Sequence, residues 1–406
     1  MMKETKMKRV PKLRFPEFTD DWEQRKLDEV VERITRKNEN LESTLPLTIS
    51  AQYGLIDQNE FFDKRIASKD VSGYYLIRKG EFAYNKSTSS DAPWGAIKRL
   101  DSYENGVLST LYIVFKILYE DKTSSDYLAT YYSTELWHKG VQAIAAEGAR
   151  NHGLLNITPA DFFKTDLMLP TNISEQQKIG AYFKQLDHLI TLHQRKLEKL
   201  KELRKGVMKK LFSQEVRFKA DDGSEFPDWE EKKLGDDVQF INGRAYKQDE
   251  LLNSGKYLVL RVGNLFTNDS YYYSDLELDN DKYIENGDLI YAWSATFGPR
   301  IYYGEKCIYH YHIWKLKFDE NIISKIFLNY YLLYDVEKIK SQRTGGTMVH
   351  ITKNAMEHRE LQFPCLAEQQ KIADCLSTLD DVIEKQKATL AAWEELKKGL
   401  LQQMFV

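Results

Sequence analysis

The sequence has 406 residues, of which 42% are hydrophobic and 29% are charged. This length suggests two or more domains, and this composition is typical of globular proteins. No apolar run approaches the roughly 18 residues that a membrane-spanning helix needs, and the polar, basic first nine residues do not resemble a signal peptide. We therefore expect a globular, cytoplasmic protein.

The formal net charge of −3 argues against a protein that coats nucleic acid without preference, because such proteins are strongly basic. The charge is unevenly distributed, however. Between Lys178 and Phe212, ten lysine and arginine residues stand against three acidic residues, which leaves a local excess of seven positive charges. A positive strip on an otherwise neutral chain favours a protein that meets DNA on one face and a protein partner on another.

The three cysteines, Cys307, Cys365 and Cys375, are odd in number and include no CxxC pair. A disulfide framework or a zinc site is therefore not expected. Unpaired cysteine is usually buried, so we expect buried free thiols.

The sequence contains an internal duplication. Trp22 and Leu27, which follow a Phe-Pro step, return as Trp229 and Leu234 after a second Phe-Pro step, with an offset of 207 residues. A longer match pairs residues 175–212 with residues 368–405 at an offset of 193, without gaps and with 14 identities in 38 positions. A repeat of this quality indicates that the chain consists of two related halves.

The duplication divides the chain into alternating modules and helices. We expect the first module in residues 1–170, a long helix in 171–214, a linker in 215–224, the second module in 225–364 and a second long helix in 365–406. Short runs of Tyr, Phe, Val and Ile, broken by Gly, Ser and Asn, predict mainly strands in both modules. The predicted fold class is α+β, with two similar β-rich modules and two long helices.

Both predicted helices carry an apolar stripe. In the first helix the stripe consists of Ile179, Phe183, Leu186, Ile190, Leu197, Leu200, Leu203, Val207 and Leu211, and each position recurs 193 residues later in the second helix. Spacings of three and four residues predict a coiled coil. His193 and Gln386 occupy one equivalent site in the two stripes, and we interpret them as residues that set the register rather than as ligands.

The two stripes are expected to pack against each other. Because the second module lies between the helices, the chain can fold back into an antiparallel pair with pseudo-two-fold symmetry. Ser174 is the expected cap of the first helix, and Pro364 precedes the second. Alternatively, the helices serve dimerisation or form part of a packed core.

Motifs for chemistry are absent from the sequence. It contains no Asn-Pro-Pro, no GxGxxG, no P-loop and no HExxH. We expect His310 and His312 to alternate on a strand without binding metal, since no carboxylate or cysteine is spaced to assist them. The chain itself is therefore expected to be neither a methyltransferase nor a motor.

The duplicated Glu-Gln-Gln-Lys-Ile segments at 175–179 and 368–372, each after a Leu-Pro or Phe-Pro step, resemble the conserved regions of type I restriction–modification specificity subunits. The Phe-Pro and Trp-Glu segments before each module, and the linker around Arg217 and Gly223, also resemble this family. The resemblance covers nearly the whole chain.

The resemblance implies that each module is a target recognition domain that binds one half of a split DNA sequence, while the helices fix the spacer between the halves. It implies two methyltransferase subunits that methylate adenine N6 with S-adenosylmethionine, and motor-nuclease subunits that use ATP with Mg. It implies no cofactor in this chain, which would be a non-catalytic subunit.

Base recognition needs donors and acceptors on loops that can enter the major groove. Two loops in each module meet this requirement, one after the strand that follows Gly80 or Gly287 and one before Ile157 or Ile351. The candidate DNA-binding residues are Lys86, Ser87, Thr88, Ser89, Ser90, Trp94, Arg150, Asn151 and His152 in the first module, and Trp293, Ser294, Thr296, Arg300, Arg343, Thr344, Gly345, Gly346 and Thr347 in the second.

Arg261, Asn264, Gln52 and Tyr53 are weaker candidates. For Arg343 we favour base recognition over phosphate contact, because the first module has Arg150 in a comparable place, although the neighbours of the two arginines differ. Three alternative functions remain at this stage: a DNA-modifying enzyme, a coiled-coil scaffold that does not bind DNA, and a DNA-binding adaptor or orphan specificity protein outside a restriction complex.

Overall fold

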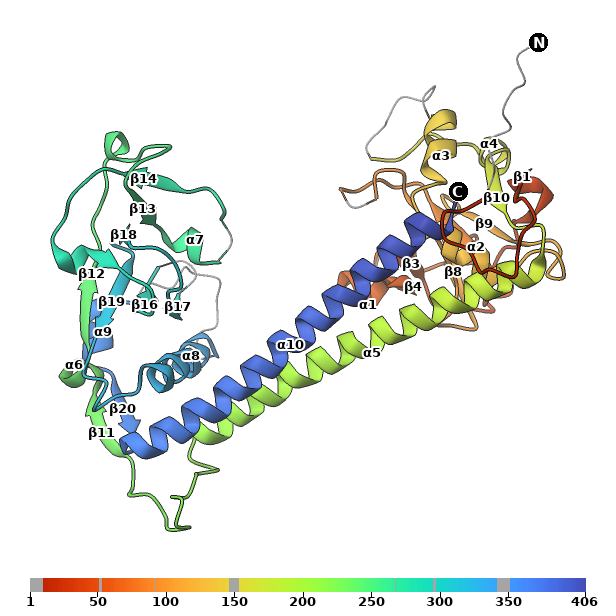
Figure 1. Ribbon diagram of the computed structural model, residues 1–406. Coiled ribbons are helices and arrows are strands. Elements are labelled where there is room, and N and C mark those ends of the chain that lie inside the picture. Colours follow the sequence, from red (N-terminus) through yellow and green to blue (C-terminus); the bar gives the residue numbers. More distant parts are fainter. Residues whose placement is uncertain are drawn as a thin grey trace. The chain divides into compact units, whose positions relative to one another are not determined.

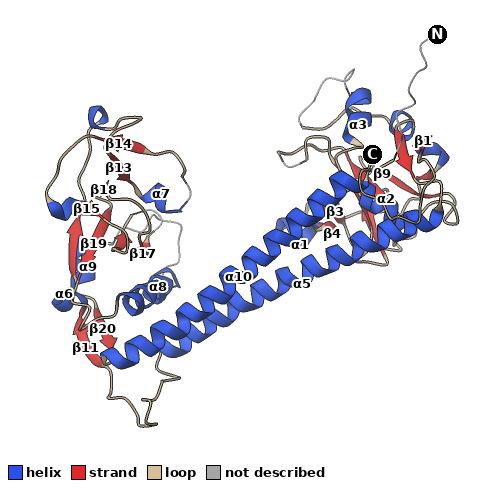
Figure 2. Ribbon diagram, in the orientation of Figure 1, coloured by secondary structure: helices blue, strands red, loops and turns tan. Residues whose placement is uncertain are grey.

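The computed structural model describes residues 10–50, 53–90, 92–145, 153–266, 268–294, 297–341 and 351–406. Contacts divide the chain into two compact units, the first reaching Gln194 and including Ala388–Val406, the second comprising Arg195–Lys387 (Figure 1). Each unit contains one β-rich module and one part of each long helix. Helices and strands are mixed within both modules, which confirms the predicted α+β class (Figure 2).

The module of the first unit consists of short elements. They are β1 (Glu23–Lys26), β2 (Val31–Ile34), β3 (Leu47–Ser50), β4 (Gly54–Asp57), α1 (Gln58–Phe62), β5 (Tyr75–Arg78), β6 (Phe82–Asn85), β7 (Ala96–Arg99), β8 (Asn105–Leu108), β9 (Ile113–Ile117), α2 (Ser125–Tyr131), α3 (His138–Ala145), α4 (Pro159–Phe163) and β10 (Asp166–Leu169).

The module of the second unit follows the same plan. Its elements are β11 (Glu230–Lys233), α6 (Leu234–Asp237), β12 (Gln239–Asn242), β13 (Tyr257–Leu260), α7 (Val262–Phe266), β14 (Tyr272–Ser274), β15 (Tyr283–Ile284), β16 (Leu289–Ala292), β17 (Gly298–Ile301), β18 (Cys307–Tyr309), β19 (Ile313–Lys317), α8 (Lys325–Ser341), α9 (Lys353–Glu357) and β20 (Glu360–Phe363).

The sheets show that the sequence repeat is also a structural repeat. A four-stranded sheet has the order β2-β9-β6-β7 in the first module and β12-β19-β16-β17 in the second. The strand before each sheet pairs with the last strand of its module, β1 with β10 and β11 with β20. The modules differ beside this frame, where the second has the sheet β14-β13-β18-β15 and the first has the separate pairs β3-β4 and β5-β8.

The long helices α5 (Ile173–Phe212) and α10 (Leu366–Met404) run antiparallel within each unit. In the first unit, Asp187 pairs with Lys397, and Gln194 further along α5 bonds Glu394, which lies earlier on α10. In the second unit, the apolar end of α5 around Phe212 shares a core with Leu376 near the start of α10. The helices therefore pair with each other inside the chain rather than serving only as a dimerisation device.

Asn172, not Ser174, caps α5. The helix begins at Ile173, and the Asn172 side chain accepts a hydrogen bond from the Ser174 backbone N–H at 2.9 Å. Ser and Asn are nearly equal as cap residues, so composition alone did not separate the two positions.

The Glu-Gln pair at the start of each long helix connects that helix to its module. The buried carboxylate of Glu175 accepts hydrogen bonds from Arg14 at 2.7 and 2.8 Å and from the Trp22 indole at 3.3 Å. Glu368 accepts the same set from Arg217, at 3.1 and 2.8 Å, and from the indole of Trp229 at 3.1 Å. We call these two clusters the latches.

The next residue in each helix completes the connection. Gln176 donates to the carbonyls of Pro170 and Lys122 and accepts from the Ser124 N–H. Gln369 makes the three equivalent bonds, to Pro364, Ile322 and Ser324. A buried amide with all these partners specifies one position of the helix against the module, which explains why the Glu-Gln dipeptide occurs twice.

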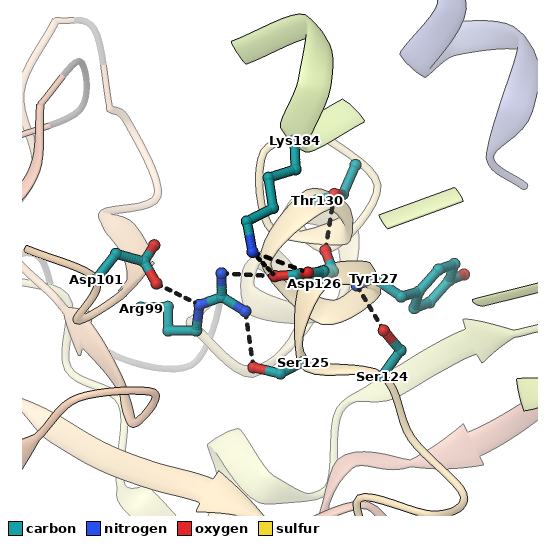
Figure 3. A network of polar contacts seen from close by, with 8 residues as sticks. All are labelled: Arg99, Asp101, Ser124, Ser125, Asp126, Tyr127, Thr130 and Lys184. Atoms are coloured by element: carbon teal, nitrogen blue, oxygen red, sulfur yellow. Dashed lines mark hydrogen bonds and ion pairs between the residues drawn. The ribbon is translucent and has the colours of Figure 1, made fainter. Parts of the chain in front are cut away.

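A polar network also binds the first module to α5 (Figure 3). Arg99 at the end of β7 donates to Asp101 and Ser125 and pairs with Asp126, which also receives Lys184 from α5. Burial alone would raise the pKa of Asp126, but the two cations outweigh it, so the pKa lies below its ordinary value. In the second module the equivalent positions hold Ile301, Ile326 and Ser377, which line an open groove.

Two residues of the predicted stripe are largely exposed. Leu203 and its equivalent Leu396 are 52% and 46% exposed, whereas most of the stripe is buried or half-buried.

The prediction of three buried thiols is correct for Cys307 alone, because Cys375 is half-buried and Cys365 is exposed. Of the helices that the structure describes, none combines the length and apolar character needed to cross a membrane.

Candidate nucleic-acid interface

The first candidate loop follows β6 and is fixed at its start. The Lys86 ammonium donates to the carbonyl of Ile157 at 3.1 Å, and partial burial lowers the pKa of Lys86. The Ser87 N–H donates to the side chain of Asn85 at 3.0 Å. Lys86 therefore supports the loop, while Thr88, Ser89 and Ser90 follow at its tip.

The structure brings the two candidate loops of the first module together. The backbone N–H and the hydroxyl of Thr88 both donate to the carbonyl of Gly153, at 2.7 and 2.9 Å. The N–H of Leu155 donates to the carbonyl of Lys86 at 3.0 Å. Gly153 directly follows Arg150, Asn151 and His152, which lie outside the described residues.

Trp94 lies at the C-terminal end of the first loop. Its carbonyl accepts a hydrogen bond from the Tyr84 hydroxyl at 2.9 Å, and its half-buried ring packs against the core. The next residue, Gly95, has a φ of +77°, and a Cβ there would lie 2.2 Å from the carbonyl oxygen of Asn85. The glycine permits this close return of the chain onto β6.

The same convergence occurs in the second module. The carbonyl of Trp293 accepts a hydrogen bond from the N–H of Ile351 at 3.4 Å, which joins the first loop to the end of the second. Ser294 beside it is buried. Thr296, Arg343, Thr344, Gly345, Gly346 and Thr347 lie outside the described residues.

Arg300 occupies a different environment from these loops. It lies on β17 opposite Ile290, the position that Lys98 holds opposite Ala83 in the first module. Its guanidinium lies 5.4 Å from the ring centre of Phe266, and it lines the groove that also includes Asp380 of α10. Trp293 and Ser294 are not among the groove residues, so Arg300 remains an isolated candidate.

The weaker candidates of the second module form hydrogen bonds within the fold. The Asn264 side chain accepts from the Arg261 N–H and donates to the carbonyls of Asn268 and Ser270, which organises that loop. Arg261 donates to Ser270, and its guanidinium lies 4.3 Å from the ring centre of Tyr272. Tyr53 is exposed, and Gln52 lies outside the described residues.

The residues between β18 and β19 complete the loop surface of the second module. His312 lies in a turn, and His310 at its start forms a β-bridge with Arg244, so the two do not alternate along one strand as expected. The Trp293 N–H donates to the carbonyl of His312 at 3.1 Å, and its indole N–H donates to the carbonyl of Tyr311 at 2.8 Å. This turn was not among the candidates identified from the sequence. The turn contacts Trp293 because β16 pairs with β19, and the sequence pattern does not reveal that pairing.

Across the described ranges we find no cluster of three or more His, Cys, Asp and Glu side chains that could hold a metal ion. The two modules instead each present adjoining loops held by backbone hydrogen bonds. This arrangement suits a binding surface, since rigid elements position variable loops.

Comparison with known proteins agrees with this description. The family model for the type I restriction modification DNA specificity domain matches residues 19–202 and again residues 227–392. A putative type I restriction enzyme MjaX specificity subunit from Methanocaldococcus jannaschii is 25% identical, with 95% of this chain and 93% of that protein covered. The MjaVIII specificity subunit of the same organism is also 25% identical, with 98% and 95% covered.

Solved structures share the fold. A chain from a structure on assembly and conformational transition of a type I R-M system has a TM-score of 0.60 at 18% identity, with 95% of this chain and 97% of that chain covered. The S subunit of a type I restriction-modification system from M. genitalium has a TM-score of 0.57 at 16% identity, with 98% and 99% covered. With two family matches that together span most of its length, the chain belongs to the type I restriction modification DNA specificity family.

Proposed function

We propose that this protein is the DNA-recognition subunit of a type I restriction–modification complex, in which each module binds one half of a bipartite target. The observation that carries the proposal is the convergence of two loops in each module, at Thr88 and Gly153 in one and at Trp293 and Ile351 in the other. Two similar surfaces on one chain fit two half-sites better than one continuous target.

The long helices would set the spacer between the half-sites. A helix of about 40 residues is roughly 60 Å long at ~1.5 Å per residue. Half-sites one helical turn of DNA apart are separated by ~34 Å. The helix length is thus sufficient for two half-sites separated by more than one turn.

The helices also offer equivalent docking positions for partner subunits. Exposed Leu189 and Leu396 belong to the first unit, and their repeat equivalents Val382 and Leu203 are exposed in the second. In each unit the two residues lie beside the ion pair that joins α5 to α10, Asp187–Lys397 or Asp380–Arg204. Exposed apolar residues of this kind favour a protein interface, and their repetition favours two copies of one partner.

We propose that these partners are two methyltransferase subunits, which transfer a methyl group to adenine N6 from S-adenosylmethionine, with motor-nuclease subunits that use ATP and Mg in the full complex. No cofactor is assigned to this chain. Since the substrate would be cellular DNA, the complex would act in the cytoplasm. An orphan specificity protein or DNA-binding adaptor outside a restriction complex is the alternative.

Mapping of methylated bases in a host with and without this chain tests the proposal. We expect one bipartite methyl-adenine motif to vanish when the chain is removed and to return when it is restored. An unchanged methylation map, together with sequence-specific DNA binding by the purified chain, would favour the adaptor. Unchanged methylation without any sequence-dependent DNA protection would favour a scaffold.

A further inference from the structure

The turn His310–Tyr311–His312 is held rigidly on two sides. On one side, Trp293 bonds the carbonyls of His312 and Tyr311. On the other, the N–H of Tyr311 donates to the carbonyl of Arg244 at 3.1 Å. A Cβ at Gly243 would lie 2.3 Å from the carbonyl oxygen of Tyr309, so the end of β12 passes directly against the turn.

Aromatic rings gather around this turn. The ring centres of Tyr311 and His312 are 4.0 Å apart, those of His310 and Tyr311 4.4 Å, and those of Trp293 and His312 4.8 Å. Tyr311 is 38% exposed, whereas Trp293 is half-buried and packs against the core. The cluster is therefore a supported platform with Tyr311 at its exposed side.

Two ionisable groups at the platform, His310 and Arg244, contribute little net charge to it. The N–H of His312 donates to Nδ1 of His310 at 3.4 Å, so the neutral ring of His310 carries its proton on Nε2. Burial, His312 and the nearby Arg261 lower the pKa of His310 to about 4. The guanidinium of Arg244 donates two hydrogen bonds to the carboxylate of Glu250, at 3.1 and 2.7 Å, and this ion pair balances the positive charge of Arg244. Such a surface fits base edges, which offer hydrogen-bonding groups and thymine methyls, better than phosphate.

The first module presents a turn at the corresponding place. β8 and β9 are joined by residues 109–112, where Leu111 is exposed, as β18 and β19 are joined by residues 310–312. The two modules thus carry different side chains, leucine and tyrosine, on equivalent turns. A turn that differs in length and side chains between two modules of one architecture suits a role in recognising different half-sites.

We infer that the turn His310–His312 belongs to the surface with which the second module reads its half-site, and that Tyr311 contacts base edges there. This inference rests on the proposed function. It adds to the candidate loops an element that is tied to them by the hydrogen bonds of Trp293.

The experiment uses the full chain assembled with its methyltransferase partners. Wild type, Tyr311→Ala, Tyr311→Leu and the control Tyr303→Ala are compared on the cognate duplex and on all single substitutions of both half-sites, at several salt concentrations. Tyr303 is 76% exposed and follows the end of β17 that is remote from Trp293. It is therefore an exposed tyrosine of the same module that lies away from the turn. Tyr311→Leu introduces the side chain found at the equivalent turn of the first module.

We expect Tyr311→Ala to lose about tenfold discrimination at one or more positions of the second module's half-site. The first module's half-site and the dependence of affinity on salt should stay as in wild type, and Tyr311→Leu should alter preference at the same positions. Tyr303→Ala should resemble wild type.

Wild-type base preferences in both Tyr311 variants would overturn the inference. Equal weakening on every duplex with a reduced salt slope would also overturn it, because that is the signature of a phosphate contact. Absence of any bipartite preference in the wild-type complex would instead contradict the proposed function.

Discussion

At the scale of single residues, the two latch glutamates are charged side chains buried in the protein. Glu175 and Glu368 are buried, and each depends on an arginine and a tryptophan that enter from the segment before the module. A buried carboxylate is tolerated only when it is paired and hydrogen-bonded. The latch therefore makes the start of each helix dependent on residues about 140 to 160 positions away.

Glu368→Ala should destabilise the second unit by about 3–5 kcal/mol, because Arg217 would lose its buried partner and keep the exposed Asp228 at 3.6 Å. Arg217 retains some exposure, which favours the lower end of this range. Urea unfolding followed by tryptophan fluorescence measures the loss. Glu384→Ala is the control, since Glu384 is an exposed residue of the same helix that pairs with the exposed Lys387, and should cost less than about 0.5 kcal/mol. Equal losses for the two variants would contradict the role of the latch.

The three thiols should differ in reactivity. Burial raises the pKa of Cys307 to about 11 and also raises that of Cys375, while Cys365 is exposed. Because the thiolate is the reactive form, iodoacetamide at pH 8 should modify Cys365 first and Cys307 last. Peptide mapping by mass spectrometry gives the order, and a denatured sample should show all three modified. Rapid modification of Cys307 in the folded protein would contradict its burial.

At the scale of elements, each long helix has to do two things at once. One side packs against the partner helix, and the other carries exposed apolar residues at positions repeated between the two helices. The ion pairs Asp187–Lys397 and Asp380–Arg204 are repeat equivalents, so both units join α5 to α10 in the same way. The repeat thus extends from the sequence to individual side-chain pairs.

Leu396→Glu and Leu203→Glu should each weaken the binding of one methyltransferase subunit by about tenfold or more, because a charge would be buried at an apolar contact. The mass of the assembled complex, measured by light scattering, should fall by one partner for each variant and by two for the double variant. Leu136→Glu, at an exposed apolar residue outside the helices, is the control. Full assembly of the double variant would exclude these positions from the interface.

Four residues inserted into both helices, after Leu192 and at the equivalent place after Lys385, test the role of helix length. Four residues add about one helical turn and can be absorbed by local unwinding of the pair. We expect a longer spacer in the methylated motif with unchanged half-sites. Motif mapping measures both, and an active protein with an unchanged spacer would contradict the ruler hypothesis.

At the scale of the whole molecule, the two modules have separate hydrophobic cores. One is built around Phe82 and Phe115 with the start of α5, and the other around Trp314 and Phe327 with the start of α10. Among the residues that the structure describes, neither core includes residues of the other module, so we expect each module to change its loops independently. This independence is what a modular reader of two half-sites requires.

Replacement of residues 225–363 by the corresponding module of another family member should therefore change one half of the methylated motif only. The half-site of the first module and the methylation activity should be retained. Sequencing of methylated bases in a host that carries the chimaera measures the outcome. A change in both halves would show that the modules do not act independently.

The sequence by itself determined the duplication, the two long helices and the α+β modules. These features are periodic or repeated, so local spacing is sufficient to detect them. It also identified the paired loops of each module as candidates from their composition and their place after equivalent strands.

Other features depended on the tertiary structure. Leu203 and Leu396 fit the helical stripe, but their side chains are largely exposed in the packed structure. Arg300 follows the candidate loop in sequence, but its strand partner places it on a groove wall. The turn at Tyr311 joined the loop surface because β16 pairs with β19, a contact between residues about 20 positions apart that no local pattern encodes. The physical reason is common to all three: side-chain direction and neighbours are set by long-range packing, which periodicity does not contain.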